Sequence, residues 1–68
     1  MRCNLSKIMG EKRIKISDLA RATNINRGTL TRMYYDEATR VELDVIERLC
    51  NHLGLGIGDL YEIENSDA

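Results

Sequence analysis

The 68-residue sequence contains no proline, tryptophan or phenylalanine, and its aromatic residues are three tyrosines. A chain without proline and with few strand-favouring residues is expected to be helical. No apolar run approaches the roughly 20 residues that a membrane-spanning helix needs, and the first residues lack the apolar core of a signal peptide. We therefore expect a protein of the cytoplasm with no membrane partner.

Two cysteines, Cys3 and Cys50, are too few for a disulfide framework, and a cytoplasmic location predicts that both stay reduced. A zinc site that adds His52 is disfavoured, because residues two apart on a helix point in different directions and no second ligand pair is suitably spaced. The sequence also lacks a Ser-His-Asp arrangement, a glycine-rich phosphate loop and a convincing carboxylate pair. These absences predict a non-enzyme without metal, cofactor or small-molecule effector.

Charge is nearly balanced in total but unevenly distributed along the chain. The formal net charge is −1, yet residues 1–35 carry eight basic and two acidic side chains, a net charge of +6. Residues 36–68 carry two basic and nine acidic side chains, a net charge of −7. Charges that only solvate a surface would be interspersed. Because a polyanion responds to the local field of the surface it meets, the positive half predicts a nucleic-acid partner.

The stretch Ile16–Tyr35, ISDLARATNINRGTLTRMYY, predicts two short helices joined by a tight turn. The first helix is expected to start near Ser17 and to end at Thr23. Asn24 follows as a residue that tolerates the left-handed conformation found at helix ends. Ile25 is then expected to fill the turn from inside.

The second helix of this pair is expected from Arg27 to about Tyr35. Asn26 precedes it as an N-cap that accepts from the backbone N–H of Gly28 or Thr29. Helical spacing directs one set of side chains inward, namely Leu30, Met33 and Tyr34. The opposite face carries basic, hydroxyl and small residues, namely Arg27, Gly28, Thr31, Arg32 and Tyr35. A helix pair of this form is typical of a DNA-binding helix-turn-helix.

Three further helical segments are expected around this pair. Residues 4–13 form the first, with Asn4 as its N-cap and with Gly10 indicating a close helix crossing. The longest runs from about Leu43 to Leu53, and its predicted inward stripe comprises Leu43, Ile46, Leu49, Cys50 and Leu53. A short helical turn is expected from Asp59 to Glu62. The polar tail 65–68 is expected to be disordered.

The spacing resembles the helix-turn-helix of the lambda-repressor and Cro family, also called the xenobiotic-response-element family. The residues that carry the resemblance are Leu19-Ala20, Asn24-Ile25-Asn26, Leu30 and Met33, and the segment ATRVELDVIERLCNHLGLGIGDLYE extends it. The resemblance implies an all-α, compact domain of four to five helices over residues 1–64, with the helix-turn-helix at about 16–35. Asn24 stands where the family has glycine, and Ile16 stands where it often has a phosphate-binding glutamine.

The family's roles transfer to matching positions of this chain. Base readout in the major groove is implied for Arg27, Gly28, Thr31 and Arg32. Contact with the DNA backbone is implied for Asn26, Thr29, Tyr35 and Arg40, and Lys15 or Ser17 is expected to replace the missing glutamine.

An apolar cluster near the end of the chain is larger than so small a domain is expected to bury. Its members are Leu55, Ile57, Leu60, Tyr61 and Ile63. A patch of this kind usually marks association, and the near-palindromic operators of the family imply a homodimer through this region. Packing of the same residues onto the first helix is the alternative.

Together these features predict a sequence-specific regulator that binds double-stranded DNA as a homodimer and represses transcription by occlusion. A nucleoid-associated protein of a prokaryote or a phage is expected. The alternative is a protein-interaction module, antitoxin-like or an adaptor, that uses the same helical scaffold without DNA.

Overall fold

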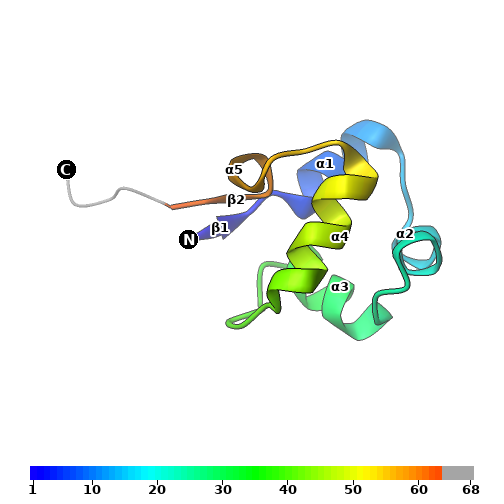
Figure 1. Ribbon diagram of the computed structural model, residues 1–68, viewed down its shortest axis with the longest axis horizontal. Helices are drawn as coiled ribbons and strands as arrows, with labels where there is room; N and C mark the ends of the chain where they lie inside the picture. The colour runs from blue at the N-terminus through cyan, green and yellow to red at the C-terminus, as the bar shows by residue number, and fades with distance from the viewer. Residues whose placement is uncertain (64–68) are drawn as a thin grey trace.

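A computed structural model describes residues 1–63 as a small helical domain closed by a two-stranded sheet (Figure 1). The elements in chain order are β1 (Arg2–Cys3), α1 (Leu5–Lys12), α2 (Ile16–Thr23), α3 (Arg27–Tyr34), α4 (Leu43–Leu53), α5 (Ile57–Leu60) and β2 (Tyr61–Glu62). The predicted all-α class is confirmed. No helix in this part of the chain is long and apolar enough to cross a bilayer.

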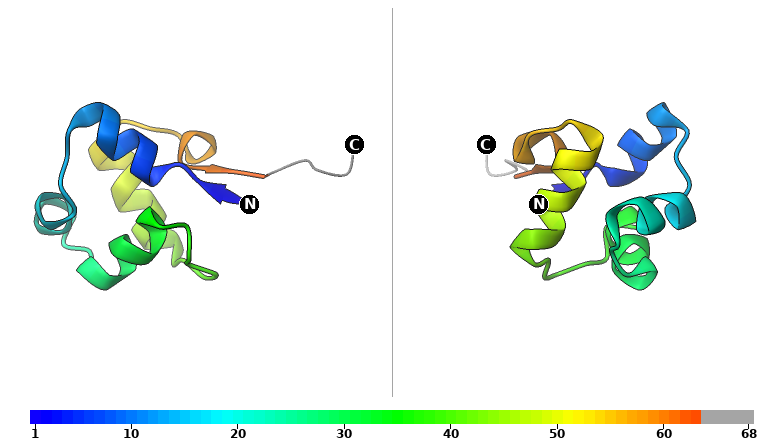
Figure 2. Two further views of the ribbon diagram at one scale, coloured as in Figure 1. Left: turned by 180° about the vertical axis from the view of Figure 1, so that it is seen from behind. Right: turned by 45° about the vertical axis from the view of Figure 1, so that its right-hand side comes forward.

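The helices enclose one core to which every helix contributes. α2 packs against α3 and α4, and α1 packs against α3. The two views of Figure 2 show α4 and α1 on opposite sides of the domain, with α3 below them. The side chains with almost no solvent exposure are Leu5, Met9, Leu19, Leu30, Met33, Leu49 and Leu60. Burial of a leucine or methionine of this size contributes about 1.5–3 kcal/mol each, so this core is the main source of stability.

The inward stripe predicted for α4 is correct except at its first residue. Leu49, Cys50 and Leu53 are buried and Ile46 packs partly against the core, but Leu43 is 79% exposed. Leu43 begins the helix, where α4 extends beyond the elements that it covers. Periodicity identifies the apolar side of a helix but not the point at which the core beneath it ends.

Each of the four longer helices is followed, within two residues of its end, by a residue in the left-handed conformation. These residues are Arg13, Asn24, Asp36 and Gly54, with φ of 55°, 60°, 58° and 70°. The prediction for Asn24 is confirmed, whereas the left-handed conformation at Arg13 and Asp36 was not predicted. At Asp36 the N–H of Glu37 donates to the carbonyl of Arg32 at 2.8 Å, which stops α3 with a Schellman-type turn.

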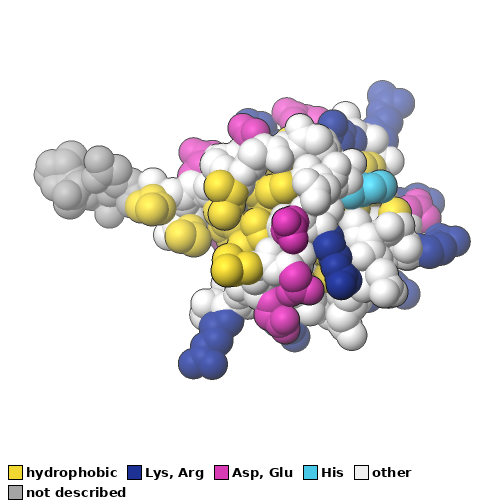
Figure 3. All heavy atoms as spheres, in the orientation of Figure 1, with side chains coloured by type: hydrophobic (Ala, Val, Ile, Leu, Met, Phe, Trp, Pro, Cys, Tyr) yellow, Lys and Arg dark blue, Asp and Glu magenta, His cyan; other side chains and the backbone are white. Residues whose placement is uncertain are grey.

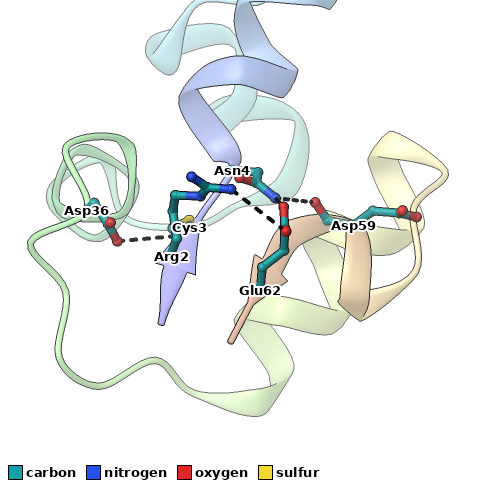
Figure 4. Close-up of polar contacts among 6 residues, drawn as sticks. All are labelled: Arg2, Cys3, Asn4, Asp36, Asp59 and Glu62. Carbon is teal, nitrogen blue, oxygen red and sulfur yellow. Dashed lines mark hydrogen bonds and ion pairs between the residues drawn. The ribbon is translucent and has the colours of Figure 1, made fainter. Parts of the chain in front are cut away.

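Asn4 is the N-cap residue of α1, as predicted, but its side chain makes no capping hydrogen bond. Its amide donates instead to the carbonyl oxygen of Asp59 at 3.2 Å and to the carboxylate of Glu62 at 2.6 Å (Figure 4). Gly10 has no atom within 4 Å of the place where a Cβ would lie. No helix therefore crosses α1 closely at Gly10, and this expectation is wrong.

The helix predicted from Asp59 to Glu62 lies two residues earlier, as α5. The Asp59 carboxylate accepts from the N–H of Gly56 at 3.0 Å, which fixes the start of α5 at Ile57. The chain then extends into β2, which pairs antiparallel with β1. The sequence did not predict this pairing, because two-residue strands at opposite ends of a chain carry no periodic signal. The predicted tail 65–68 lies outside the described residues.

A first prediction concerns Asn24, the left-handed residue between α2 and α3. Replacement of Asn24 by alanine should lower the free energy of unfolding by about 1 kcal/mol, since a Cβ without a compensating polar side chain disfavours positive φ. Replacement by glycine should leave stability at or above that of the parent chain. Urea unfolding of both variants, with unchanged dependence on denaturant, measures the difference; equal stabilities would contradict the assignment.

A second prediction concerns Tyr61, whose buried hydroxyl meets no well-formed hydrogen-bond partner within residues 1–63 and lies beside the Cys3 thiol. Burial, and then the contact with Cys3, raises the pKa of Tyr61 above its usual value. The neutral side chain therefore contributes stability that is complete below the unfolded-state pKa of about 10 and is lost as the pH rises further.

Tyr61→Phe should be at least as stable as the parent at neutral pH and should lose less stability above about pH 10, because phenylalanine does not ionise. Urea unfolding at both pH values tests this. An identical alkaline loss in the two proteins would show that Tyr61 does not titrate on unfolding.

Candidate nucleic-acid interface

The turn between α2 and α3 is fixed by three consecutive residues. Asn24 adopts the left-handed conformation, Ile25 is buried beneath the turn, and Asn26 caps α3. The Asn26 side-chain oxygen accepts from the N–H of Gly28 at 2.7 Å, as predicted. Below the turn, the Thr23 hydroxyl donates to the carbonyl of Leu19 at 2.7 Å, which satisfies a buried polar group within α2.

α3 divides into two faces along the line that the sequence predicts. Leu30 and Met33 are fully buried, and Tyr34 packs partly against the core. The exposed face presents Arg27, Gly28, Thr31, Arg32 and Tyr35. The Tyr34 and Tyr35 rings lie edge to face, with their centroids 5.0 Å apart, so Tyr35 is held against the end of the helix although it is 63% exposed.

The start of α3 explains why residue 28 is glycine. A Cβ at this position would lie 3.0 Å from the Asn26 side-chain oxygen and would press on the cap. Gly28 therefore serves the capping hydrogen bond as well as leaving the helix backbone accessible. One turn further along α3, the Thr31 hydroxyl donates to the carbonyl of Arg27 at 2.8 Å. The hydroxyl proton is therefore used within the helix, whereas the hydroxyl oxygen remains free to accept a hydrogen bond.

A first basic hollow lies at one edge of the exposed face, where α3 meets the start of α2. Lys15, Ser17, Arg27 and Tyr35 line it, over a floor of Met9, Ile14, Ile16 and Tyr34. No side chain within residues 1–63 caps the start of α2, so its first backbone N–H groups face outward at the positive end of the helix dipole. Ammonium, guanidinium, hydroxyl and backbone donors together suit a phosphate group.

A second basic hollow lies at the opposite edge of the same face, where α3 meets the start of α4. Thr29, Arg32 and Arg40 line it together with Val41, Glu42 and Val45. The sequence assigned Arg32 to the base-reading set and Arg40 to the backbone set, whereas the structure brings them to one hollow. Glu42, which was not predicted as a site residue, adds a carboxylate that moderates the positive charge there.

The two arginines of α3, Arg27 and Arg32, lack the carboxylate partners that arginines of α2 and α4 have within the described residues. Arg21 pairs with Asp18 at 2.9 Å, and Arg48 lies 3.7 Å from Asp44. Within the described residues, neither Arg27 nor Arg32 forms an ion pair. Both guanidinium groups therefore keep their donors available for an external acceptor.

The residues considered for metal binding lie apart from this face. Cys3 and Cys50 are buried free thiols, as the inward stripe predicts for Cys50, and His52 is exposed. Burial, and then the charge of Asp59, raises the pKa of the Cys50 thiol, which makes it a poor ligand or nucleophile. Residues 1–63 contain no group of three or more His, Cys, Asp or Glu side chains placed to hold a metal ion.

The apolar cluster near the end of the chain is partly core and partly surface. Leu60 is fully buried and offers no surface to a partner, so its place in the predicted dimer interface is wrong. Leu55 and Tyr61 are half-buried, whereas Ile57 and Ile63 are 59% and 80% exposed. Figure 3 shows hydrophobic side chains gathered on the face that carries α4, with acidic side chains beside them.

Comparison with known proteins agrees with this geometry. The family model for the Cro/C1-type HTH DNA-binding domain matches residues 4–66, which include every helix of the fold. A comparison with curated proteins gives no significant match. The match confirms the resemblance that the spacing of the α2–α3 residues indicated. The chain therefore belongs to the Cro/C1-type helix-turn-helix DNA-binding domain family.

Proposed function

We propose that this DNA-binding domain acts as a homodimeric repressor that binds a near-palindromic operator in double-stranded DNA. The main support for the proposal is that the exposed face of α3 lies between two basic hollows. A helix that enters the major groove passes between two phosphate backbones, one on each side. The arrangement offers a helix for the base edges and a hollow for each backbone.

Base readout is assigned to the exposed face of α3, with Gly28 and Thr31 between the two hollows and Arg27 and Arg32 at their edges. The free guanidinium groups suit bidentate contacts to guanine O6 and N7, each worth about 1–3 kcal/mol of discrimination against a wrong base. Gly28 lets the start of the helix approach the bases closely. The Thr31 oxygen accepts from a base amino group, and its methyl group suits a thymine methyl.

Backbone contacts are assigned to the two edges of this face. Lys15, Ser17 and Tyr35 hold one phosphate in the first hollow, with the uncapped start of α2 behind them. These groups take over the phosphate contact of the glutamine that the family often has at the position of Ile16. Thr29 and Arg40 hold a phosphate on the other side, and the Asn26 side-chain NH₂, which capping leaves unused, adds a donor near the start of α3.

The small size of the reading element supports a homodimer. α3 has eight residues, and one such helix reads only a few base pairs. Two copies on one duplex combine two weak contacts into strong binding, because the second binding event becomes intramolecular. Ile57 and Ile63, exposed near the end of the described chain, supply the apolar surface for this association. Repression then results when the bound dimer occludes a promoter.

A protein-interaction module on the same scaffold, antitoxin-like or an adaptor, is the second candidate, and salt dependence separates the two. Binding through phosphates releases counterions, so affinity for duplex DNA falls steeply as the salt concentration rises. An adaptor bound through the apolar surface would show the weaker salt dependence of an apolar interface.

A third prediction tests the base-reading assignment. Arg27→Ala and Arg32→Ala should each weaken binding to the preferred duplex by about 1–3 kcal/mol and relax the base preference at one position of each half-site. Fluorescence anisotropy with the preferred duplex and with single-base variants measures both effects at fixed salt.

Matched controls distinguish base readout from a general loss of charge. Arg21→Ala removes the same charge from α2, but its guanidinium is already paired with Asp18, so binding should change little. Lys15→Ala should weaken all sequences alike and lower the salt slope by about one. The assignment is contradicted if Arg27→Ala and Arg32→Ala behave as Lys15→Ala does.

A further inference from the structure

The end of α2 differs from the ends of the other three longer helices. After α1, α3 and α4, the N–H of the next residue donates back to a carbonyl in the last turn of the helix. Asn24, which follows α2, makes no well-formed bond of this kind within the described residues. The turn that directs α3 is therefore less firmly closed by its own backbone than the other helix ends are.

A side chain from α4 contacts this turn instead. The Arg48 guanidinium donates through Nη1 to the backbone carbonyl oxygen of Asn24 at 3.3 Å. Its Nη2 lies 3.7 Å from the carboxylate of Asp44, one turn earlier in α4. A planar guanidinium presents donors in more than one direction, so one nitrogen bonds to the turn while the other is directed toward Asp44. Arg48 thus links a carboxylate of α4 to the turn between α2 and α3.

Arg48 lies apart from the proposed DNA contacts. It lines a third hollow, together with Ala22, Thr23, Asn51 and His52. None of these residues lines either of the two basic hollows that flank the exposed face of α3. Because α2 packs against both α3 and α4, the third hollow lies where the α2–α3 pair is attached to α4. Any effect of Arg48 on DNA binding is therefore expected to act through the turn.

We propose that Arg48 is a positioning residue for base reading, which holds the Asn24 carbonyl, and with it the turn, in the orientation that directs α3 into the major groove. The proposal rests on the proposed base reading by α3 and adds a residue that controls it. Without Arg48, α3 has to be fixed in its direction when it binds, and this ordering lowers the affinity for the preferred sequence. Nonspecific binding depends on charge and needs no fixed direction of α3.

The contact is too exposed to be a main source of stability. The side chains of Arg48 and Asp44 are 48% and 54% exposed, and ion pairs between such groups stabilise a fold only slightly. If Arg48 is removed, the Asn24 carbonyl can bond to water, so no buried polar group is left without a partner. An effect on DNA binding can therefore be measured separately from unfolding.

A fourth prediction separates positioning from charge. Arg48→Gln and Arg48→Lys should each weaken binding to the preferred duplex by about threefold to tenfold, the loss expected for one hydrogen bond. Lysine keeps the charge but lacks the planar fork that serves the turn and Asp44 together. For Arg48→Lys, the affinity for a random-sequence duplex and the salt slope should equal those of the parent, because no phosphate contact is lost. Fluorescence anisotropy over a range of salt concentrations measures all three quantities.

Asp44 provides a test in which positioning and charge predict opposite signs. Removal of a carboxylate should strengthen binding to a polyanion if charge alone matters. If Asp44 orients Arg48, Asp44→Asn should instead weaken binding to the preferred duplex by about twofold, and should add nothing to Arg48→Gln. Glu47→Gln is the matched control, because Glu47 is an exposed carboxylate of α4 without an ion pair within residues 1–63. It should leave binding unchanged or slightly stronger.

Nuclear magnetic resonance reports the contact itself. A hydrogen bond to the Asn24 carbonyl polarises the peptide group that it shares with Ile25. The amide nitrogen resonance of Ile25 should therefore move in Arg48→Gln and stay in place in Glu47→Gln.

The outcomes distinguish this proposal from base reading itself. Parent-like binding of Arg48→Lys to the preferred duplex, or equal losses on preferred and random duplexes, would overturn positioning and leave base reading intact. A large loss of stability on urea unfolding would assign Arg48 a general structural role instead. A parent chain that prefers no duplex sequence would overturn base reading as well.

Discussion

The packing of α2 against α3 across the Asn24–Asn26 turn determines the direction and the rotation of α3. The left-handed Asn24 reverses the chain, the buried Ile25 holds the turn against the core, and the Asn26 cap begins α3 in a fixed direction. With Leu30 and Met33 fully buried, the rotation of α3 about its own axis is also fixed. The exposed face and both basic hollows follow from that rotation, because their residues belong to α3 and to the elements packed beside it.

The remaining elements connect this reading unit to the ends of the described chain. Asp36 stops α3 with a left-handed residue and also accepts from the N–H of Cys3 in β1. β1 in turn pairs with β2, whose Glu62 is bound by Asn4 at the start of α1. The end of α3 and the two-stranded sheet are therefore joined by short, direct contacts.

The sequence predicted the elements whose signals are local and missed those that depend on distant partners. Helix periodicity, the Asn26 cap and the left-handed Asn24 all depend on neighbours within a few residues, and the structure confirms them. The β1–β2 pairing, the Asn4 contacts and the meeting of Arg32 with Arg40 join residues far apart in the chain, and no pattern within a segment encodes them. Leu43 and Leu60 show the same limit, because hydropathy identifies an apolar side chain but not whether a core or solvent adjoins it.

We propose that two copies of α3 read duplex DNA in a two-fold arrangement. In vitro selection from random duplexes, carried out with the full chain, tests this proposal. We expect an enriched motif of two inverted half-sites, with centres about one helical turn, roughly 10 base pairs, apart. Failure to enrich any motif at moderate salt would contradict sequence-specific reading. A motif with a single half-site would contradict the two-fold arrangement while leaving the reading face intact.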